Sequence, residues 1–309
     1  MTDQQQLTDH GHRHQHGHQH HHHDGAEMDW DVMGPLLEMG AEVEAPVVDQ
    51  AAVWLRERAE AAGAPPVRRL LDIGSGPGVG ACQFARAFPE AEVVAVDGTE
   101  ALLERTRARA AGLGLAERVH TRLADLPDGL DAIGDADLIW SSMTLHHIGD
   151  QQDAVERLAR KLRPGGLLAV AEGGLPMRAL PRDIGFGRPG LQARLDVLND
   201  DWFTDMRAAL PDAKEAVEDW PAFLAAAGLT DVRSRTFLID LPAPLGADAR
   251  AYVHATLARK GEAANELLDA EDRAALERLL DPEDPRGLLL RPDAFLLGAR
   301  TVHTAVRPA

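Results

Sequence analysis

The sequence has few cysteines, few basic residues and no long apolar run, and each deficit excludes a class of protein. Its single cysteine, Cys82, excludes an intrachain disulfide framework and suits a reducing cytoplasm. Its 32 basic residues against 50 acidic ones give a net charge of −18, which disfavours binding to the nucleic-acid backbone. No apolar run approaches the roughly 20 residues of a membrane span, and no signal peptide precedes the domain. We therefore expect a soluble cytoplasmic protein that binds neither nucleic acid nor membrane.

Length and hydrophobic content set the scale of the fold. With 309 residues, 45% of them hydrophobic, the chain is long enough for one large α/β domain or a domain with an appended lobe. Residues 1–25 stand apart, because they hold nine histidines among Gln, Gly and Asp. Such a segment is predicted to be a disordered tail with incidental affinity for transition metals. We assign no catalytic metal to it.

Residues 26–66 are predicted to form helices ahead of the main domain. Val47, Ala51 and Trp54 follow the i, i+4, i+7 spacing of an amphipathic helix, and a shorter helical piece precedes them at 30–37. Gly63-Ala64-Pro65-Pro66 ends the helix. These helices are expected to pack on the core or to cover a pocket as a lid.

The stretch 67–80 predicts a strand that turns abruptly into a helix. Residues 67–73 form an apolar run typical of a buried strand, and glycines follow at 74, 76, 78 and 80. Small and apolar residues then return at helical spacing. Glycines let a ligand approach the backbone closely, and the N–H groups at the start of a helix face the same space. An ordinary glycine-rich turn is the alternative.

Strands and helices continue to alternate as far as residue 174. Further strands are predicted at 91–96, 118–123, 136–140 and 167–171. This order predicts a doubly wound parallel sheet whose ligand lies at the carboxyl ends of the strands. Asp97 ends the second strand, where an acid can accept hydrogen bonds from ribose hydroxyls. After the third strand, Asp125 can accept from an exocyclic amine and Leu126 can pack on a flat ring; a turn or helix cap is the alternative role of each acid.

Taken together, these features resemble the class I S-adenosylmethionine-dependent methyltransferases. The matching motifs are Asp72-x-Gly74-x-Gly76-x-Gly78, Asp97, Ala124-Asp125, Leu145-His146-His147 after the Asp137-Leu138-Ile139 strand, and Arg163-Pro164-Gly165-Gly166. The similarity covers about residues 67–174 and is to the small-molecule branch that includes ubiquinone and menaquinone methyltransferase-like enzymes. It implies a Rossmann-like, seven-stranded sheet with an antiparallel last strand between the fifth and the sixth. It also implies S-adenosyl-L-methionine as the cofactor.

The resemblance assigns residues to the methionine end of that methyl donor. Gly74, Ser75 and Gly76 are implied to lie against the methionine portion. Ser141 matches a position whose backbone meets the methionine amino group. Asp72 is implied to organise the loop and the ammonium end without taking part in the chemistry.

The nucleoside end of the methyl donor is assigned in the same way. Asp97, with Gly98 beside it, matches the ribose-binding acid, and Asp125 with Leu126 matches the pair that contacts adenine. The run 76–81 also fits the G-x-G-x-x-A dinucleotide fingerprint, which keeps an NAD-dependent oxidoreductase as a competing hypothesis. A proline between the fingerprint glycines and an acid ahead of them disfavour that hypothesis.

Beyond residue 174 the pattern predicts helical insertions in the domain. The stretches at about 175–218 and 245–290 are longer than normal connections and are expected to form a helical cap over the pocket. Strands are predicted at 230–241 and near 297–302. The predicted organisation is a tail (1–25), N-terminal helices (26–66) and a methyltransferase domain with two insertions (67–309).

Methyl transfer is an in-line displacement, for which a protein must align the acceptor and exclude water. His146, His147 and Glu172 lie near the ligand edge of the predicted sheet and are the candidate catalytic residues. The two histidines can instead cap a helix or pack beside the cofactor. We expect a methyltransferase acting on a small molecule, with a non-catalytic regulatory protein that binds the methyl donor as the alternative. The sequence leaves open the acceptor, its reacting atom and the oligomeric state, a homodimer included.

Overall fold

The structure, a computed structural model, describes residues 29–61, 63, 65–264 and 266–309. The predicted histidine-rich tail, 1–25, lies outside these residues. The strands are β1 (Arg69–Ile73), β2 (Glu92–Asp97), β3 (Val119–Leu123), β4 (Ala136–Ser142), β5 (Leu162–Arg178), β6 (Thr230–Leu241) and β7 (Leu296–Val306). The helices are α1 (Trp30–Ala61), α2 (Val79–Ala87), α3 (Glu100–Gly112), α4 (Gln151–Lys161), α5 (Leu191–Ala208), α6 (Trp220–Ala226), α7 (Ala247–Ala263) and α8 (Ala270–Leu280). Over the described ranges, none of the helices combines the length and the apolar character needed to cross a membrane.

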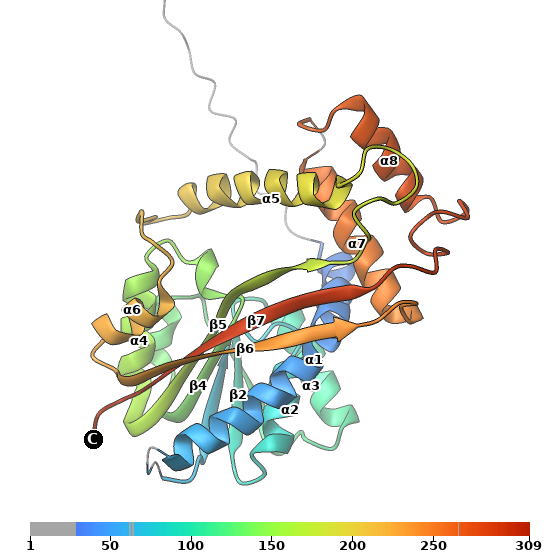
Figure 1. Cartoon of the computed structure of the whole chain (residues 1–309). Coiled ribbons are helices and arrows are strands. Elements are labelled where there is room, and N and C mark those ends of the chain that lie inside the picture. The colour runs from blue at the N-terminus through green and yellow to red at the C-terminus, as the bar shows by residue number, and fades with distance from the viewer. Residues whose placement is uncertain (1–28, 62, 64, 265) are drawn as a thin grey trace, which may run out of the picture.

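The strands form a seven-stranded sheet in the order β3-β2-β1-β4-β5-β7-β6 (Figure 1). Strands β1 to β5 pair in parallel, as strands joined by helical crossovers must. Strand β7 runs antiparallel to both of its neighbours, β5 and β6. The predicted doubly wound sheet, with its antiparallel last strand between the fifth and the sixth, is confirmed.

Helices cover both faces of the sheet, as the apolar strand sequences require (Figure 1). In β1, Leu70 and Leu71 are both at most 1% exposed although their side chains point to opposite faces. Leu70 packs with residues of α1 and α2, and Leu71 packs with residues of α4 and α6. Two apolar layers therefore hold the central strands rigidly, and their carboxyl ends form a fixed edge on which a site can be built.

Two elements, α1 and β5, differ in detail from what the sequence predicts. The N-terminal segment is one continuous helix, α1, although Pro35 and Pro46 lie within it. Strand β5 continues to Arg178, beyond the predicted end near Ala171, because it keeps pairing with β7 after a register shift at Gly174. A Cβ on Gly174 would lie 2.2 Å from the carbonyl oxygen of Ala299, so this close approach of two strands requires glycine.

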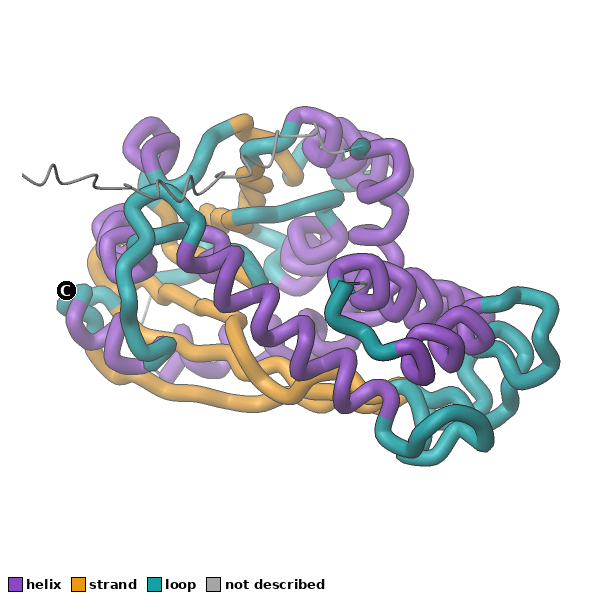
Figure 2. The backbone as a smooth tube through the Cα atoms, turned by 90° about the horizontal axis from the view of Figure 1, so that it is seen from above, coloured by secondary structure: helices purple, strands orange, loops and turns teal. Residues whose placement is uncertain are grey.

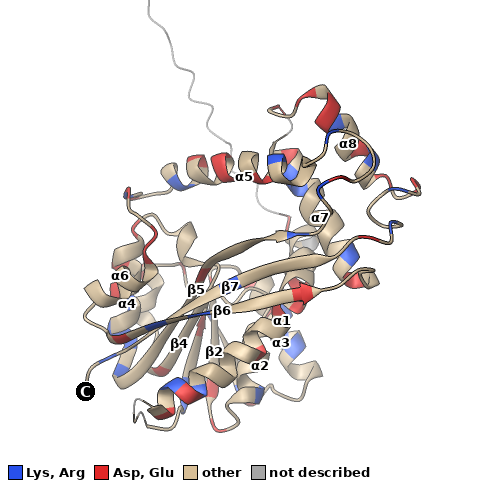
Figure 3. Cartoon of the chain, in the orientation of Figure 1, with Lys and Arg blue, Asp and Glu red and all other residues tan. Residues whose placement is uncertain are grey.

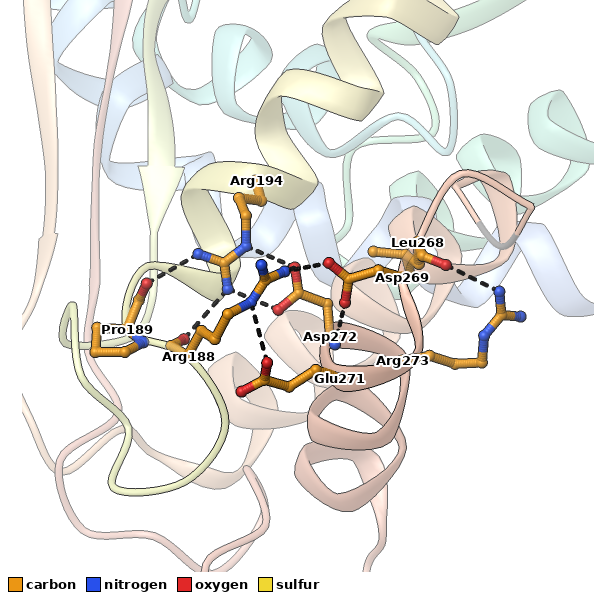
Figure 4. A network of polar contacts seen from close by, with 8 residues as sticks. All are labelled: Arg188, Pro189, Arg194, Leu268, Asp269, Glu271, Asp272 and Arg273. Carbon is orange, nitrogen blue, oxygen red and sulfur yellow. Dashed lines mark hydrogen bonds and ion pairs between the residues drawn. The ribbon is translucent and has the colours of Figure 1, made fainter.

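The insertions form helices beyond the end of the sheet, with α5, α7 and α8 adjoining one another (Figures 1 and 2). Both acidic and basic residues occur along these helices (Figure 3). The buried carboxylate of Asp272 on α8 accepts two hydrogen bonds from the guanidinium of Arg194 on α5, at 2.6 and 2.7 Å, and one from Arg188 at 2.8 Å (Figure 4). Because breaking a buried ion pair leaves an uncompensated charge, this network fixes α5 against α8.

Candidate active site

A cavity of about 720 Å³ lies at the carboxyl ends of the central strands, the edge at which the sequence places the ligand. The segments that follow the strands form the glycine-loop wall: Asp72, Gly74, Ser75, Gly76, Pro77, Gly80, Gln83, Asp97, Gly98, Thr99, Leu102, Asp125, Leu126, Trp140, Ser142, Met143, Thr144, His146, His147 and Ile148. Elements distant in sequence form the helical wall: Leu36, Leu37, Gly40, Ala41, Glu44 and Val48 of α1, Tyr252, Thr256 and Arg259 of α7, and Arg300 of β7. All predicted site residues except Ser141 and Glu172 line this one space.

The glycine loop turns where the backbone must adopt conformations that side chains disfavour. Gly74 has φ +68, and its N–H donates to the carbonyl of Val96 at 2.8 Å, which ties the loop to the neighbouring strand. A Cβ on Gly74 would lie 2.1 Å from Oγ1 of Thr144. Gly76 has φ +53, but a Cβ there would meet nothing within 4 Å. Gly74 therefore allows two strand-end segments to approach, whereas Gly76 leaves open space beside the loop.

Asp97 connects the glycine loop to the start of α3. Its Oδ2 accepts a hydrogen bond from the N–H of Gly76 at 2.9 Å, and its Oδ1 accepts one from the N–H of Thr99 at 2.9 Å. Burial raises the pKa of Asp97, and hydrogen bonds from the backbone of Gly76, Thr99 and Gly98 and from the side chain of Thr99 lower it in part. The carboxylate lines the cavity, and ionised carboxylate oxygens accept hydrogen bonds from hydroxyl donors. This arrangement is suited to the predicted contact with the two hydroxyls of a ribose.

Asp72 is buried at the end of β1 and lines the same cavity. Burial raises its pKa to about 7, repulsion from Asp97 adds to the effect, and the N–H of Ala81 opposes it. Within the described residues, no basic side chain forms an ion pair with Asp72. A cationic group bound beside it would stabilise the ionised form, which agrees with its predicted place at an ammonium group.

The remaining residues of the predicted nucleoside site also lie together. An added Cβ on Gly98 would be 3.2 Å from Oδ1 of Asp125, so the ends of β2 and β3 are in contact. Leu126 lines the cavity next to Asp125. Ser141 is different, because it lies within β4 and is fully buried, and its neighbour Ser142 lines the cavity in its place.

His146 and Glu172 form a hydrogen-bonded pair at the edge of the cavity. Oε2 of the buried Glu172 lies 2.8 Å from Nδ1 of His146, and Oε1 accepts from the N–H groups of Thr144 and Leu145, both at 2.8 Å. When the carboxylate accepts from Nδ1–H, the lone pair of the neutral imidazole is on Nε2. Glu172 does not line the cavity. Glu172 therefore contacts His146 from behind, and the imidazole of His146 is the part of the pair that lines the cavity.

His147 lies beside this pair, with its ring centroid 4.1 Å from that of His146. Its pKa is lowered to about 4, chiefly by desolvation and also by repulsion from His146 and Arg207, while Glu172 opposes these effects. At neutral pH, His147 is therefore uncharged and is a weaker base than an ordinary histidine. Its exposed ring lines the cavity and packs against His146.

Five charged or hydroxyl-bearing residues of the helical wall were not predicted from the sequence. Tyr252, Thr256 and Arg259 occupy i, i+4 and i+7 on α7, a spacing that places them on one helix face. Arg300 of β7 pairs with Glu44 of α1, with its Nε 3.0 Å from Oε2. The helical spacing on α7 is visible in the sequence, but nothing local indicates that this face meets the glycine loop.

The donor set of the glycine-loop wall fits a positively charged nucleoside. The carboxylates of Asp72, Asp97 and Asp125 form no ion pair with any described basic residue. Glycine backbone and the apolar Leu126 complete this wall. Within the described ranges, no group of three or more His, Cys, Asp or Glu side chains is arranged to hold a metal ion. The cavity can thus hold a sulfonium-bearing methyl donor beside a histidine that can accept a proton.

Part of this chain, including the glycine loop, is similar to proteins that are already known. The family described as a methyltransferase domain matches residues 70–166. The chain is 33% identical over 132 residues to 27-O-demethylrifamycin SV methyltransferase of Amycolatopsis mediterranei, covering 42% of this chain and 47% of that protein. It is 29% identical over 243 residues to trans-aconitate 2-methyltransferase of Methylobacterium nodulans, covering 75% of this chain and 87% of that protein.

The family match and the relatives cover different shares of the chain: residues 70–166 for the family, and from 33% to 75% of the chain for the relatives. The chain spans between 24% and 47% of the length of several curated relatives that it matches. Among solved structures, an O-methyltransferase family protein of Burkholderia thailandensis aligns with 14% identity and a TM-score of 0.43, over 85% of this chain and 59% of that one. The match of residues 70–166 to the methyltransferase domain, together with the relatives named as methyltransferases, supports a class I S-adenosylmethionine-dependent methyltransferase.

Proposed function

We propose that this protein transfers a methyl group from S-adenosyl-L-methionine to a small-molecule acceptor. The observation that carries the proposal is that one cavity brings the glycine loop, Asp97 and Asp125 together with the imidazole of His146. S-adenosylmethionine, when bound, supplies an electrophilic methyl group with a neutral thioether as the leaving group. The net charge of −18 and a cavity of about 720 Å³ favour a small acceptor over a nucleic acid. The single cysteine, buried and free, suits action in a reducing cytoplasm.

Each wall has its own task in this proposal. Gly74, Ser75 and Gly76 hold the methionine portion, Asp72 faces the ammonium group, and Asp97 accepts from the ribose hydroxyls. Asp125 and Leu126 hold the adenine ring. The α1 and α7 side chains enclose the acceptor and exclude water, which strengthens each electrostatic contact inside the cavity.

His146 is proposed to remove the proton from the nucleophilic atom of the acceptor. Glu172 holds the imidazole through Nδ1 at 2.8 Å and leaves Nε2 as the proton acceptor. As the acceptor atom loses its proton to Nε2, positive charge develops on the ring, and the buried carboxylate stabilises it. This role favours an acceptor with an O–H or N–H group.

A two-stage experiment tests the proposal. Titration calorimetry with S-adenosylhomocysteine measures binding at the methyl-donor site, and absence of binding would reject the proposal. Incubation with S-adenosylmethionine and a metabolite extract, followed by mass spectrometry, then searches for compounds heavier by one methyl group. Binding without any methylated product would support the alternative function, a regulatory protein that senses the methyl donor.

A further inference from the structure

The cavity separates charge between its two walls. The glycine-loop wall carries the carboxylates of Asp72, Asp97 and Asp125, which suit a cationic methyl donor. The helical wall carries two guanidinium groups, those of Arg259 and Arg300. These opposite charges indicate that the two walls hold different chemical groups.

The two arginines of the helical wall are not equivalent. Arg300 is mostly buried, with 15% of its side chain exposed, and its charge is balanced by Glu44 through two guanidinium–carboxylate contacts. Arg259 lies exposed at the rim, and no carboxylate of the described residues forms an ion pair with it. Arg259 is thus the cation of this wall whose charge is available to a ligand.

Two hydroxyl groups extend from the same face of α7 as Arg259. Tyr252 and Thr256 precede it by seven and three positions, and all three side chains reach the cavity. Gly40 of α1 makes room for the tyrosine ring, because a Cβ there would lie 3.0 Å from its Cε2. The pKa of Tyr252 is raised by burial and by Glu44 and lowered in part by Arg300, Thr256 and Arg259. At neutral pH the phenol therefore keeps its proton and can donate a hydrogen bond.

We propose that Tyr252, Thr256 and Arg259 form a subsite that binds an anionic oxygen group of the methyl acceptor, a carboxylate or a phosphate monoester. A planar guanidinium with two neighbouring hydroxyl donors matches the acceptor oxygens of such a group. The inference rests on the proposed function and extends it, because it names the chemical class of the acceptor.

Titration calorimetry on the full chain saturated with S-adenosylhomocysteine tests this subsite. The probes are succinate for a carboxylate, phenyl phosphate for a phosphate monoester, and neutral succinamide as the comparison, all at constant ionic strength because salt screens an exposed charge. We expect succinate or phenyl phosphate to bind and succinamide to bind at least about tenfold more weakly. The probe that binds more tightly identifies the source of the anionic group.

Variants then assign the binding to α7. Arg259→Gln is expected to weaken binding of the anionic probe by about tenfold. Tyr252→Phe and Thr256→Val are expected to weaken its binding by about two- to fivefold each. Arg122→Gln removes the same charge from an exposed position on β3 outside the cavity, and it should leave binding unchanged.

Three results would overturn the subsite: neither anion binds, succinamide binds equally well, or Arg259→Gln and Arg122→Gln have equal effects. The binding of S-adenosylhomocysteine is measured separately in the same preparation. If it is normal while the anions fail to bind, the subsite is rejected and the proposed function stands. If S-adenosylhomocysteine itself does not bind, the proposed function is rejected, and the anion titrations without it still decide the subsite.

Discussion

The two walls of the cavity are built in different ways. The glycine-loop wall consists largely of backbone and short acids at the ends of parallel strands, and the methyltransferase family match at 70–166 covers most of it. The helical wall consists of longer side chains from α1, α7 and β7, all outside that match. Backbone at rigid strand ends holds one geometry, whereas helices joined by insertions can vary without disturbing the sheet. In the proposed function, the first wall holds the methyl donor and the second recognises the acceptor.

His146 stands where the two functions meet, and its replacement should give the largest effect. His146→Gln is expected to lower kcat by roughly 10²- to 10⁴-fold, the usual contribution of a general base. Binding of S-adenosylhomocysteine should change little, because the methyl-donor contacts lie on other residues. Steady-state kinetics and calorimetry measure the two quantities, with His120→Gln on β3 as the matched control. Full turnover by His146→Gln would remove the proposed base.

Gly74 and Gly76 allow the glycine-loop wall to be tested with a matched pair. Gly74→Ala combines a positive φ with a Cβ 2.1 Å from Oγ1 of Thr144, and it should cost about 2–4 kcal/mol in the free energy of unfolding. Gly76→Ala has the positive φ without the contact and should cost about 1–2 kcal/mol. Urea unfolding measures both. Equal losses would show that the approach of Thr144 is not what requires glycine at 74.

Asp97 should affect binding of the methyl donor alone. Asp97→Ala removes the carboxylate that is proposed to accept from the ribose, with an expected loss of about 1–3 kcal/mol in binding S-adenosylhomocysteine. The variant also loses the bonds to the N–H groups of Gly76 and Thr99, so the free energy of unfolding is measured alongside. Asp135→Ala, at an exposed position outside the cavity, is the control. Unchanged affinity in Asp97→Ala would refute the ribose assignment.

The smallest expected effect is the pH dependence that titration of Asp72 gives to binding of S-adenosylhomocysteine. Because its pKa is raised to about 7, the carboxyl is half protonated near neutrality and attracts an ammonium group only when ionised. Binding of S-adenosylhomocysteine should therefore be roughly five- to tenfold weaker at pH 6 than at pH 7.5. Asp72→Asn should remove this dependence, and calorimetry at several pH values checks it.

Titration of Asp72 should have the opposite effect on the stability of the protein without a ligand: stability should fall as the pH rises, whereas binding should strengthen. The folded protein keeps this proton up to about pH 7, whereas the unfolded chain releases it near the ordinary value of 3.8. The contribution of Asp72 to stability is therefore complete below about pH 3.8 and is lost as the pH rises through about 7. Urea unfolding of Asp72→Asn should lack this part of the pH dependence. A wild-type slope that persists in Asp72→Asn would assign the titration to another group.

The sequence predicts the parallel part of the fold well because its signals are local. Apolar runs, the glycines after residue 73 and the acid at Asp97 lie within one βαβ unit, so their spacing alone indicates their arrangement. The pairing of Glu44 with Arg300 could not be predicted in this way, because the two residues are 256 positions apart. Which of Ser141 and Ser142 lines the cavity depends on a one-residue register at the end of β4, which a pattern does not determine, and the contact of the Ser141 backbone stays a prediction.

Arg207 at the end of α5 has a consequence for altering the acceptor range. Its guanidinium donates to the carbonyl oxygens of His146 and Ile148, at 2.8 and 2.6 Å. A Cβ on Gly149 would lie 2.0 Å from the carbonyl oxygen of Pro211, so the turn after the histidines and the segment after α5 fit each other closely. A graft of residues 175–218 from another methyltransferase would therefore displace the imidazole unless the turn at 146–149 is transplanted with it. The two segments form one replaceable cassette, although Arg207 lies 61 and 59 positions after the two residues that it contacts.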